Sequence, residues 1–291
     1  MILYKTTITP TSNFATTLKG DTLFGQICWA IRYQFSEDRL NKLLNNYETN
    51  PFLIVSDGFA SGYLPKPNMP SLLLEEDGNL KKQNRKKIWL TLDELQNGNY
   101  KKAKTDIQVD NKDQTQSSVK TAINYRTNTT GNGFDPYSIT EAYFSKKDIY
   151  FLIDDNFSLD ELETSLNTVS QMGYGKKATI GKGRFTIGEF EEIKLNTTSK
   201  TFMTLSPSVL NGINAKNVYY EPFTRFGKHG AELSNTNPFK KPIILADTKA
   251  VINFKDKTNL EFVGKAIKGI STHNNTVHQG YSMVIPIKEI L

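Results

Sequence analysis

The chain has 291 residues, more than one hydrophobic core usually organises, so we expect two domains. Hydrophobic side chains make up 37% of the chain and aromatic ones 11%, which predicts a globular protein with packed cores and excludes a disordered one. The formal net charge of +6 indicates attraction to polyanions.

No segment approaches the roughly 18 consecutive apolar residues of a membrane span, and the first residues contain no apolar run behind a basic stretch. The sequence therefore predicts a cytoplasmic protein with no membrane partner. Cys28 is the one cysteine, which excludes disulfides within the chain and cysteine-based zinc sites. The histidines do not have the spacing of a metal-binding motif, so we expect no metal and no cofactor.

The first 55 residues predict a strand, two helices and a second strand. Residues 2–8 have strand-like composition and Pro10 ends the strand. Apolar residues then recur at helical spacing from 23 to 34, with Asp21 as the expected N-cap. A shorter helix is predicted over 37–47 and a strand over 53–55.

A large insertion interrupts this pattern from about residue 65 to about residue 147, where prolines and polar residues accumulate. Residues 149–153 then predict a strand, Ser158 and Glu161 form a capping box before a helix, and residues 185–190 predict another strand. The order β, α, β, insertion, β, α, β is typical of a split βαβ, ferredoxin-like unit, which RNA-recognition domains also use.

The rest of the chain contains further predicted strands, at residues 251–254 and 281–287. We expect an α+β fold with two ferredoxin-like domains. The N-terminal domain spans residues 1–190 and includes the insertion, and the C-terminal domain, residues 191–291, is a degenerate copy.

Residues 173–184 carry the strongest local signal, a glycine-rich basic run between a predicted helix and a predicted strand. Glycines let backbone N–H groups approach a ligand, and lysine and arginine supply the charge that phosphates require. It is not a Walker A loop, because Gly183 follows Lys182 where serine or threonine is required, and a preceding helix excludes a Rossmann fingerprint. A mobile basic loop is the alternative interpretation. The candidate phosphate-binding residues are Gly173, Tyr174, Gly175, Lys176, Lys177, Thr179, Gly181, Lys182, Gly183 and Arg184.

This loop and four other segments resemble the RAMP superfamily of CRISPR proteins, which have a glycine-rich loop after the last helix of a ferredoxin-like domain. Residues 18–30 (LKGDTLFGQICWA) are similar to the first RAMP motif. Residues 56–67 (SDGFASGYLPKP), 223–230 (FTRFGKHG) and 237–242 (NPFKKP) are similar to segments of the Cas-five-like subunits that bind the 5′ tag of the crRNA in type III-A (Csm) complexes. Ala60 stands where that family usually has proline.

The resemblance implies a non-catalytic RNA-binding subunit that caps the repeat-derived 5′ tag of the crRNA in antiviral defence. Its implied partners are the crRNA, the large polymerase-like subunit, the adjacent backbone RAMP subunit and, indirectly, the target RNA. Further RNA-binding candidates are Lys19, Gly20 and Asp21 in the first motif and Arg225, Lys228 and His229 in the C-terminal half.

Residues 120–129 align with the hairpin thumb of RAMP proteins. Asn124, Tyr125 and Arg126 are candidates there, although Tyr125 replaces an acidic residue of the family pattern. An exposed tyrosine with an adjacent arginine is suited to base stacking, worth about 1–3 kcal/mol per base. A solvated loop is the alternative interpretation.

Two other functions are compatible with the sequence. A RAMP endoribonuclease that processes precursor crRNA would use His229 or His278 as a general base near a 2′-hydroxyl. A scaffold would use the basic surface to bind an acidic protein.

Overall fold

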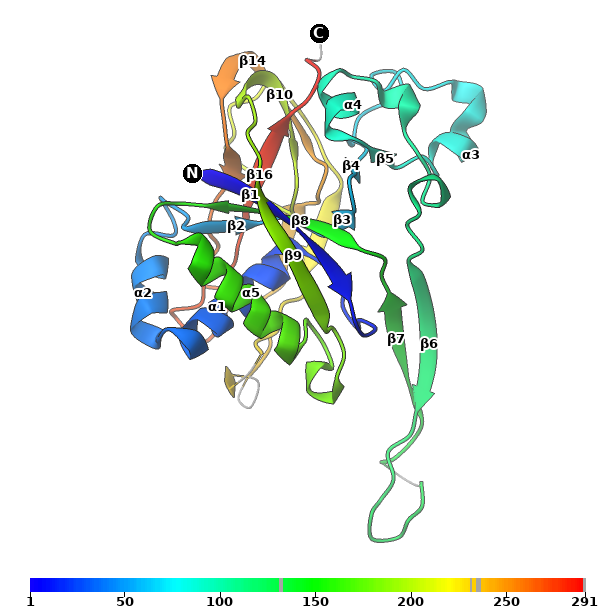
Figure 1. Ribbon diagram of the computed structural model, residues 1–291, viewed down its shortest axis with the longest axis vertical. Helices are drawn as coiled ribbons and strands as arrows, with labels where there is room; N and C mark the ends of the chain where they lie inside the picture. The colour runs from blue at the N-terminus through cyan, green and yellow to red at the C-terminus, as the bar shows by residue number, and fades with distance from the viewer. Residues whose placement is uncertain (131–132, 231, 234–236, 290–291) are drawn as a thin grey trace.

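Two antiparallel sheets organise the protein, and Figure 1 shows the second sheet beyond one edge of the first. The computed structural model describes residues 1–130, 133–230, 232–233 and 237–289. The first sheet consists of β1 (Ile2–Pro10), β2 (Leu53–Val55), β3 (Phe59–Ala60), β8 (Lys147–Ile153) and β9 (Phe185–Glu192). Its strand order is β2-β8-β1-β9, and β3 also pairs with β8. The predicted order of strands and helices in this half is therefore present.

The helices α1 (Gly20–Gln34) and α5 (Leu159–Met172) lie side by side against this sheet, and α2 (Glu37–Asn45) packs beside α1. The predicted capping box of α5 is confirmed: the Glu161 N–H donates to Ser158 Oγ, and the Ser158 N–H donates to Glu161 Oε2. Leu162, Leu166 and Val169 recur at helical spacing and are buried.

Asp21 was the expected N-cap of α1, and that prediction is wrong. The cap position is Lys19, without a side-chain capping hydrogen bond, and Asp21 lies inside the first turn of the helix. Its carboxylate is buried and accepts hydrogen bonds from Arg225 instead. A charged partner distant in sequence therefore replaces the local cap.

The second sheet contains β10 (Thr198–Thr204), β11 (Asn217–Tyr219), β14 (Val251–Asn259), β15 (Phe262–Gly264) and β16 (Tyr281–Pro286), in the order β11-β14-β10-β16-β15. Both strands predicted in this half are confirmed. The described residues from 193 onward include no α-helix. A separate two-stranded sheet is formed by β12 (Pro222–Arg225) and β13 (Ile243–Ala246).

The insertion has two parts. The first contains β4 (Leu64–Pro65), α3 (Lys81–Asn84), β5 (Trp89–Leu90) and α4 (Leu92–Gln96), with 3-10 turns at Gly78–Leu80, Tyr100–Lys102 and Ile107–Val109. The second part is the hairpin of β6 (Gln114–Lys120) and β7 (Tyr137–Tyr143). Figure 1 shows this hairpin projecting far from the sheets, as the sequence predicts for a thumb. We call it the arm.

The two halves share one hydrophobic core. The main cluster of buried apolar side chains includes Ile8 and Leu53 from the first sheet and Met203, Val251 and Met283 from the second. A smaller cluster, around Phe202, lies under the second sheet alone. The predicted domain boundary at 190/191 falls near the end of β9 at Glu192, so the boundary separates two sheets that are packed together.

Gln279 joins the halves through hydrogen bonds. Its fully buried side chain accepts from the Val55 N–H (2.9 Å) and donates to the Val55 carbonyl (2.8 Å). The Gln279 amide thereby makes the two hydrogen bonds that a neighbouring strand would make to Val55 at the end of β2. Because both groups of Val55 are buried, each needs a partner inside the protein.

Replacing Gln279 by alanine should destabilise the whole chain. It leaves the buried N–H and carbonyl of Val55 without hydrogen-bond partners, at a cost of about 1–3 kcal/mol each. Urea unfolding followed by circular dichroism should report a loss of at least about 2 kcal/mol. Gln171→Ala on the exposed side of α5 is the matched control, expected within about 0.5 kcal/mol of the unmodified protein. Equal stability of both variants would contradict the role of Gln279.

Candidate nucleic-acid interface

The glycine-rich loop closes on itself between the end of α5 and the start of β9. The Tyr174 N–H donates to the Gly183 carbonyl (2.8 Å), and Gly183 has a φ of +76°. A Cβ atom on Gly183 would lie 2.1 Å from the Tyr174 carbonyl oxygen. Only glycine fits there.

Gly181 differs from Gly183. A Cβ atom on Gly181 would meet no protein atom within 4 Å. Its φ of +84° is the constraint that favours glycine. The tight packing is at Gly173, Gly175 and Gly183, where an added Cβ would lie 2.5 Å or less from a neighbouring atom.

Tyr174 fixes the loop to the start of α1. Its fully buried ring carries a hydroxyl that donates to the Thr17 carbonyl (2.7 Å) and accepts from the Lys19 N–H (3.0 Å). Burial raises the pKa of this hydroxyl. The Gly175 N–H donates to Gln26 Oε1 at 3.2 Å. Tyr174 therefore positions the loop from inside the protein, and its ring is not presented to a ligand.

Lys182 fixes the other side of the loop. Its Nζ lies 2.9 Å from Glu141 Oε1 and donates to Asn13 Oδ1 at 2.7 Å. The hydrogen bond from Lys182 lowers the pKa of Glu141. Because Glu141 belongs to β7, this pair connects the loop to the root of the arm. Lys182 is thus occupied within the protein and is not a free cation for phosphate.

Three basic side chains of the loop are exposed: Lys176, Lys177 and Arg184. Among the residues that the structure describes, none of the three has a carboxylate within ion-pair distance. Their backbone is held in place, since the Lys176 N–H donates to Thr16 Oγ1 (2.9 Å) and the Arg184 N–H donates to Ser12 Oγ (2.8 Å). Thr179 is also exposed. A fixed backbone with unpaired cations is what binding of a phosphate chain requires.

Lys19 and Gly20 at the start of α1 face the C-terminal half. Lys19 Nζ lies 2.9 Å from Asp57 Oδ2 and 2.8 Å from Asp247 Oδ1. Burial opposes the positive charge, yet the two carboxylates raise the pKa of Lys19 above its ordinary value. The Gly20 N–H donates to Asp57 Oδ1 at 2.8 Å, so this motif residue also binds within the protein.

Asp21 and Arg225 form a second buried ion pair between the halves. Asp21 Oδ2 accepts from Arg225 Nε at 2.6 Å, and Asp21 Oδ1 accepts from Arg225 Nη2. His278 Nε2 lies 3.3 Å from Asp21 Oδ2. Burial alone would raise the pKa of Asp21, but His278 and Arg225 lower it to about 2. Arg225 therefore ties β12 to α1 and is not available as a phosphate ligand.

Two candidate residues in the basic segment after β12 differ in their exposure to solvent. His229 is buried, with Nε2 2.6 Å from Ser271 Oγ, and burial lowers its pKa to about 4. Lys228 is exposed, and its Nζ lies 4.5 Å from the ring centre of Phe239. Lys228 is therefore the free cation of the three candidates in this segment.

The arm carries its candidates at the far end. Asn124 Oδ1 accepts from the Arg126 N–H (3.0 Å), which forms a local turn. The Tyr125 side chain is 81% exposed, and the Arg126 guanidinium lies 5.9 Å from its ring centre. The ring and the guanidinium are both open to a ligand, which keeps the stacking interpretation possible.

Asn13, Glu141 and Asp247 position this interface, and sequence reasoning missed all three. Asn13 lies 169 residues from Lys182, Asp247 lies 228 residues from Lys19, and Glu141 lies on a different element from Lys182, so no local motif indicates them. Asp57 also positions this interface, because it receives both the Gly20 N–H and Lys19 Nζ. An alignment of related sequences that showed paired changes of opposite charge would be the signal for such residues.

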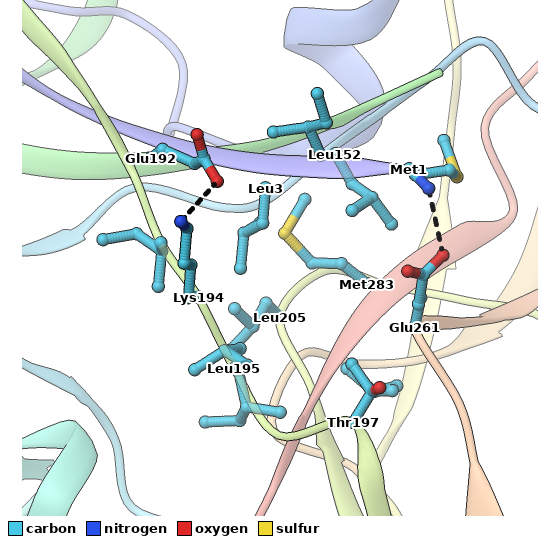
Figure 2. Close-up of a pocket in the computed structure, with 14 residues that line it drawn as sticks. Met1, Leu3, Leu152, Glu192, Lys194, Leu195, Thr197, Leu205, Glu261 and Met283 are labelled. Carbon is cyan, nitrogen blue, oxygen red and sulfur yellow. Dashed lines mark hydrogen bonds and ion pairs between the residues drawn. The ribbon is translucent and has the colours of Figure 1, made fainter. Parts of the chain in front are cut away.

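A cavity of about 210 Å³ lies between the two halves, and Figure 2 shows the residues that line it. Leu3, Leu152 and Met283 are among the apolar side chains of its wall. The charges at its rim pair with each other, Met1 N with Glu261 at 3.5 Å and Lys194 with Glu192 at 3.8 Å. The cavity is a gap in the packing between the halves and presents no converging set of reactive groups.

Within the described ranges, no three His, Cys, Asp or Glu side chains gather in an arrangement that could hold a metal ion. None of the described helices combines the length and apolar character needed to cross a membrane.

Gly183→Ala should destabilise the protein more than Gly181→Ala. Both positions have a positive φ, which costs an alanine about 1–2 kcal/mol, but only Gly183 also faces a backbone atom that an added Cβ would overlap. Thermal unfolding of both variants tests the difference. Equal losses would contradict the closed loop.

Asp21→Asn should change how stability depends on pH. The folded-state pKa of Asp21, about 2, lies below its ordinary value of 3.8, so its carboxylate stabilises the fold above about pH 4 and that contribution is lost as the pH falls toward 2. The shift corresponds to about 2 kcal/mol. Urea unfolding between pH 2 and 6 should therefore show that the difference in free energy of unfolding between the unmodified protein and the variant decreases by about that amount at low pH. A difference that does not depend on pH would contradict the lowered pKa of Asp21.

No protein-family model matches the chain, and no curated protein sequence matches it significantly. Solved structures do match over the full length. A chain of the Csm1-Csm4 cassette in complex with pppApA aligns with a TM-score of 0.62 and 14% identity, covering 100% of this chain and 99% of that one. A chain of the Csm3-Csm4 subcomplex in the type III-A CRISPR-Cas interference complex aligns with a TM-score of 0.61 and 15% identity, covering 99% and 100%. The resemblance inferred from the motifs is thus confirmed at the level of the fold: the chain has the α+β fold of a chain found in type III-A CRISPR-Cas assemblies.

Proposed function

We propose that this protein is an RNA-binding subunit of a type III CRISPR effector complex that caps the 5′ repeat-derived tag of the crRNA. The observation that carries the proposal is the fixed glycine-rich loop with three exposed cations, on a chain whose whole length has the fold of a Csm assembly chain. Fold alone would not imply function. The loop supplies the site.

The loop would bind the phosphates of a single strand through Lys176, Lys177 and Arg184. Specificity would come from base edges and 2′-hydroxyls, which single-stranded RNA exposes. Tyr125 and Arg126 at the tip of the arm are suited to stack on a nucleotide farther along the strand. Tyr174, Lys182, Lys19, Asp21 and Arg225 would act indirectly by holding the binding surface in place.

The fold proposal is that both halves are ferredoxin-like. In the first sheet the first strand, β1, pairs with the third and fourth strands of the unit, β8 and β9, and the second strand, β2, pairs with the third. The second sheet repeats this order with β10, β11, β14 and β16. A degenerate second unit that kept its strands and lost its helices accounts for the repeat.

The proposed protein partners are the large polymerase-like subunit and the adjacent backbone RAMP subunit. Csm4 is the component that the names of the two matched assemblies share, with Csm1 in one and Csm3 in the other. A Csm4-like subunit would therefore contact both. We propose a binding role in the cytoplasm without catalysis of its own, because His229 and His278 are both engaged in buried contacts.

Removing the free cations of the loop should weaken RNA binding in a salt-dependent manner. The triple variant Lys176→Gln, Lys177→Gln, Arg184→Gln should lower the log–log salt slope by up to about 2, at about 0.7 per lost single-strand phosphate contact. Fluorescence anisotropy of labelled single-stranded RNA over a range of KCl concentrations measures this. The matched control removes three exposed lysines elsewhere, Lys42, Lys194 and Lys255. Equal slopes in the two variants would rule out the loop as the phosphate site.

Tag capping itself requires the assembled complex. The chain is co-expressed with its genomic neighbours, and the complex is purified through an affinity tag fused to this chain. The bound RNA is then sequenced from its 5′ ends. A shared repeat-derived 5′ end that crosslinks to residues 173–184 is the expected result. Bound RNA without a common end would reject tag capping, and metal-independent cleavage of repeat RNA lost in His229→Ala or His278→Ala would favour the endoribonuclease.

A further inference from the structure

An exposed aromatic face lies on the segment that follows β12. From residue 222 to residue 228, side chains alternate between exposed and partly covered. Phe226 is 74% exposed, and Phe239 and Ile244 on the facing strand are 61% and 75% exposed. We call Phe226, Lys228, Phe239 and Ile244 the aromatic face. Large apolar side chains grouped in this way on a surface indicate a binding site.

Strand pairing places these side chains together. Lys228 and Phe239 are directly opposite each other in an antiparallel bridge, and Ile244 is opposite Thr224 in the β12–β13 pair. The His229 N–H donates to the Pro238 carbonyl (2.7 Å), and the Lys240 N–H donates to the Gly227 carbonyl (3.0 Å). Because side chains on one strand alternate between two faces, Phe226 and Lys228 point to the same side. The lysine Nζ lies 4.5 Å from the Phe239 ring centre.

The opposite side of the same strand is attached to the protein. Arg225 pairs with the buried Asp21, and His229 is bonded to Ser271. The side chain of Lys240 packs over Gly227, where an added Cβ would lie 3.1 Å from it. The aromatic face is therefore presented by a backbone that is fixed on its other side.

The charge around the face favours a polyanion. Within residues 222–242, Lys228 and Lys241 are exposed cations, whereas Arg225 is neutralised by Asp21 and Lys240 packs over Gly227, and Glu232 is the single acidic residue. Protein-binding surfaces are depleted of lysine at their centres, where Lys228 lies here between two phenylalanines. Aromatic rings next to cations are the arrangement that binds unpaired bases with their phosphates. Single-stranded RNA fits the face better than a protein does.

The face is physically connected to the glycine-rich loop. Arg225, next to Phe226, is bonded to Asp21 in the first turn of α1, and Tyr174 of the loop is bonded to the Lys19 N–H at the same helix end. In Figure 1 both segments lie toward the lower end of the molecule, near α1 and α5. A single strand that crosses the start of α1 can contact the two surfaces in succession.

We propose that the aromatic face stacks unpaired bases of the RNA strand whose phosphates bind the glycine-rich loop, with Phe226 and Phe239 as the stacking rings and Lys228 as the adjoining cation. This inference deepens the proposed function and rests on it for the choice of RNA.

The test uses the full chain and a short single-stranded RNA with the repeat-derived 5′ end, labelled with 2-aminopurine to report stacking. The double variant Phe226→Leu, Phe239→Leu keeps both positions apolar and removes the rings. Its affinity should fall about fivefold to a hundredfold for each lost stack, equally at all salt concentrations, and the 2-aminopurine signal of stacking should disappear. Phe35→Leu, an exposed phenylalanine at the other end of α1, is the control.

Each outcome separates this inference from the proposed function. Unchanged binding by the leucine double variant, while the loop triple variant is weakened, overturns the stacking inference and leaves tag capping intact. Weakened binding to any single-stranded RNA without preference for the 5′ end supports the aromatic face and rejects tag capping. Normal RNA binding combined with failed assembly of Phe226→Asp, Phe239→Asp with the other subunits overturns the inference in favour of a protein contact.

Discussion

The buried charges at the start of α1 determine how the rest of the protein is arranged. Two clusters of oppositely charged side chains meet there. Lys19 pairs with Asp57 and Asp247. Two residues further along, Asp21 pairs with Arg225 and His278. A buried charge left without its partner costs several kcal/mol, so each pair enforces its own geometry more than it adds stability. The helix start, the turn after β2 and the C-terminal strands can therefore adopt only one relative position, and both proposed RNA-binding surfaces extend from this point.

Local chemistry made most of the first sheet predictable. The capping box of Ser158, the apolar spacing of α5 and the strand-like run at 149–153 each depend on neighbours within a few residues. Asp21 had an equally good local signature and was predicted wrongly, because an arginine 204 residues away competes for its carboxylate. The second half was less predictable for a related reason: its short strands pair over long separations, and no helix with an amphipathic pattern marks their order.

The sequence indicated a position for the candidate site but not the role of each of its residues. Glycine and lysine content located the loop at 173–184, and Lys176, Lys177 and Arg184 are exposed as a phosphate site requires. Composition could not distinguish these cations from Lys182, which an acidic residue on the arm neutralises. Likewise Tyr174 has the appearance of a stacking residue in the sequence and is in fact fully buried. Whether a side chain faces inward depends on contacts between segments that one sequence does not reveal.

The arm has mechanical consequences that follow from its shape. A two-stranded ribbon is marginally stable by itself, and nearly all of β6 is in contact with solvent. Its firm attachments are at the root, where Lys147 holds Asn111 and Asp113, and Glu141 holds Lys182. The ribbon therefore behaves as a lever clamped at one end, in which a small rotation at the root becomes a large displacement at Tyr125. The contact at the root includes Lys182 of the glycine-rich loop. An RNA strand that shifts the loop would therefore also move the tip of the arm, so that binding at the loop and the position of Tyr125 are coupled.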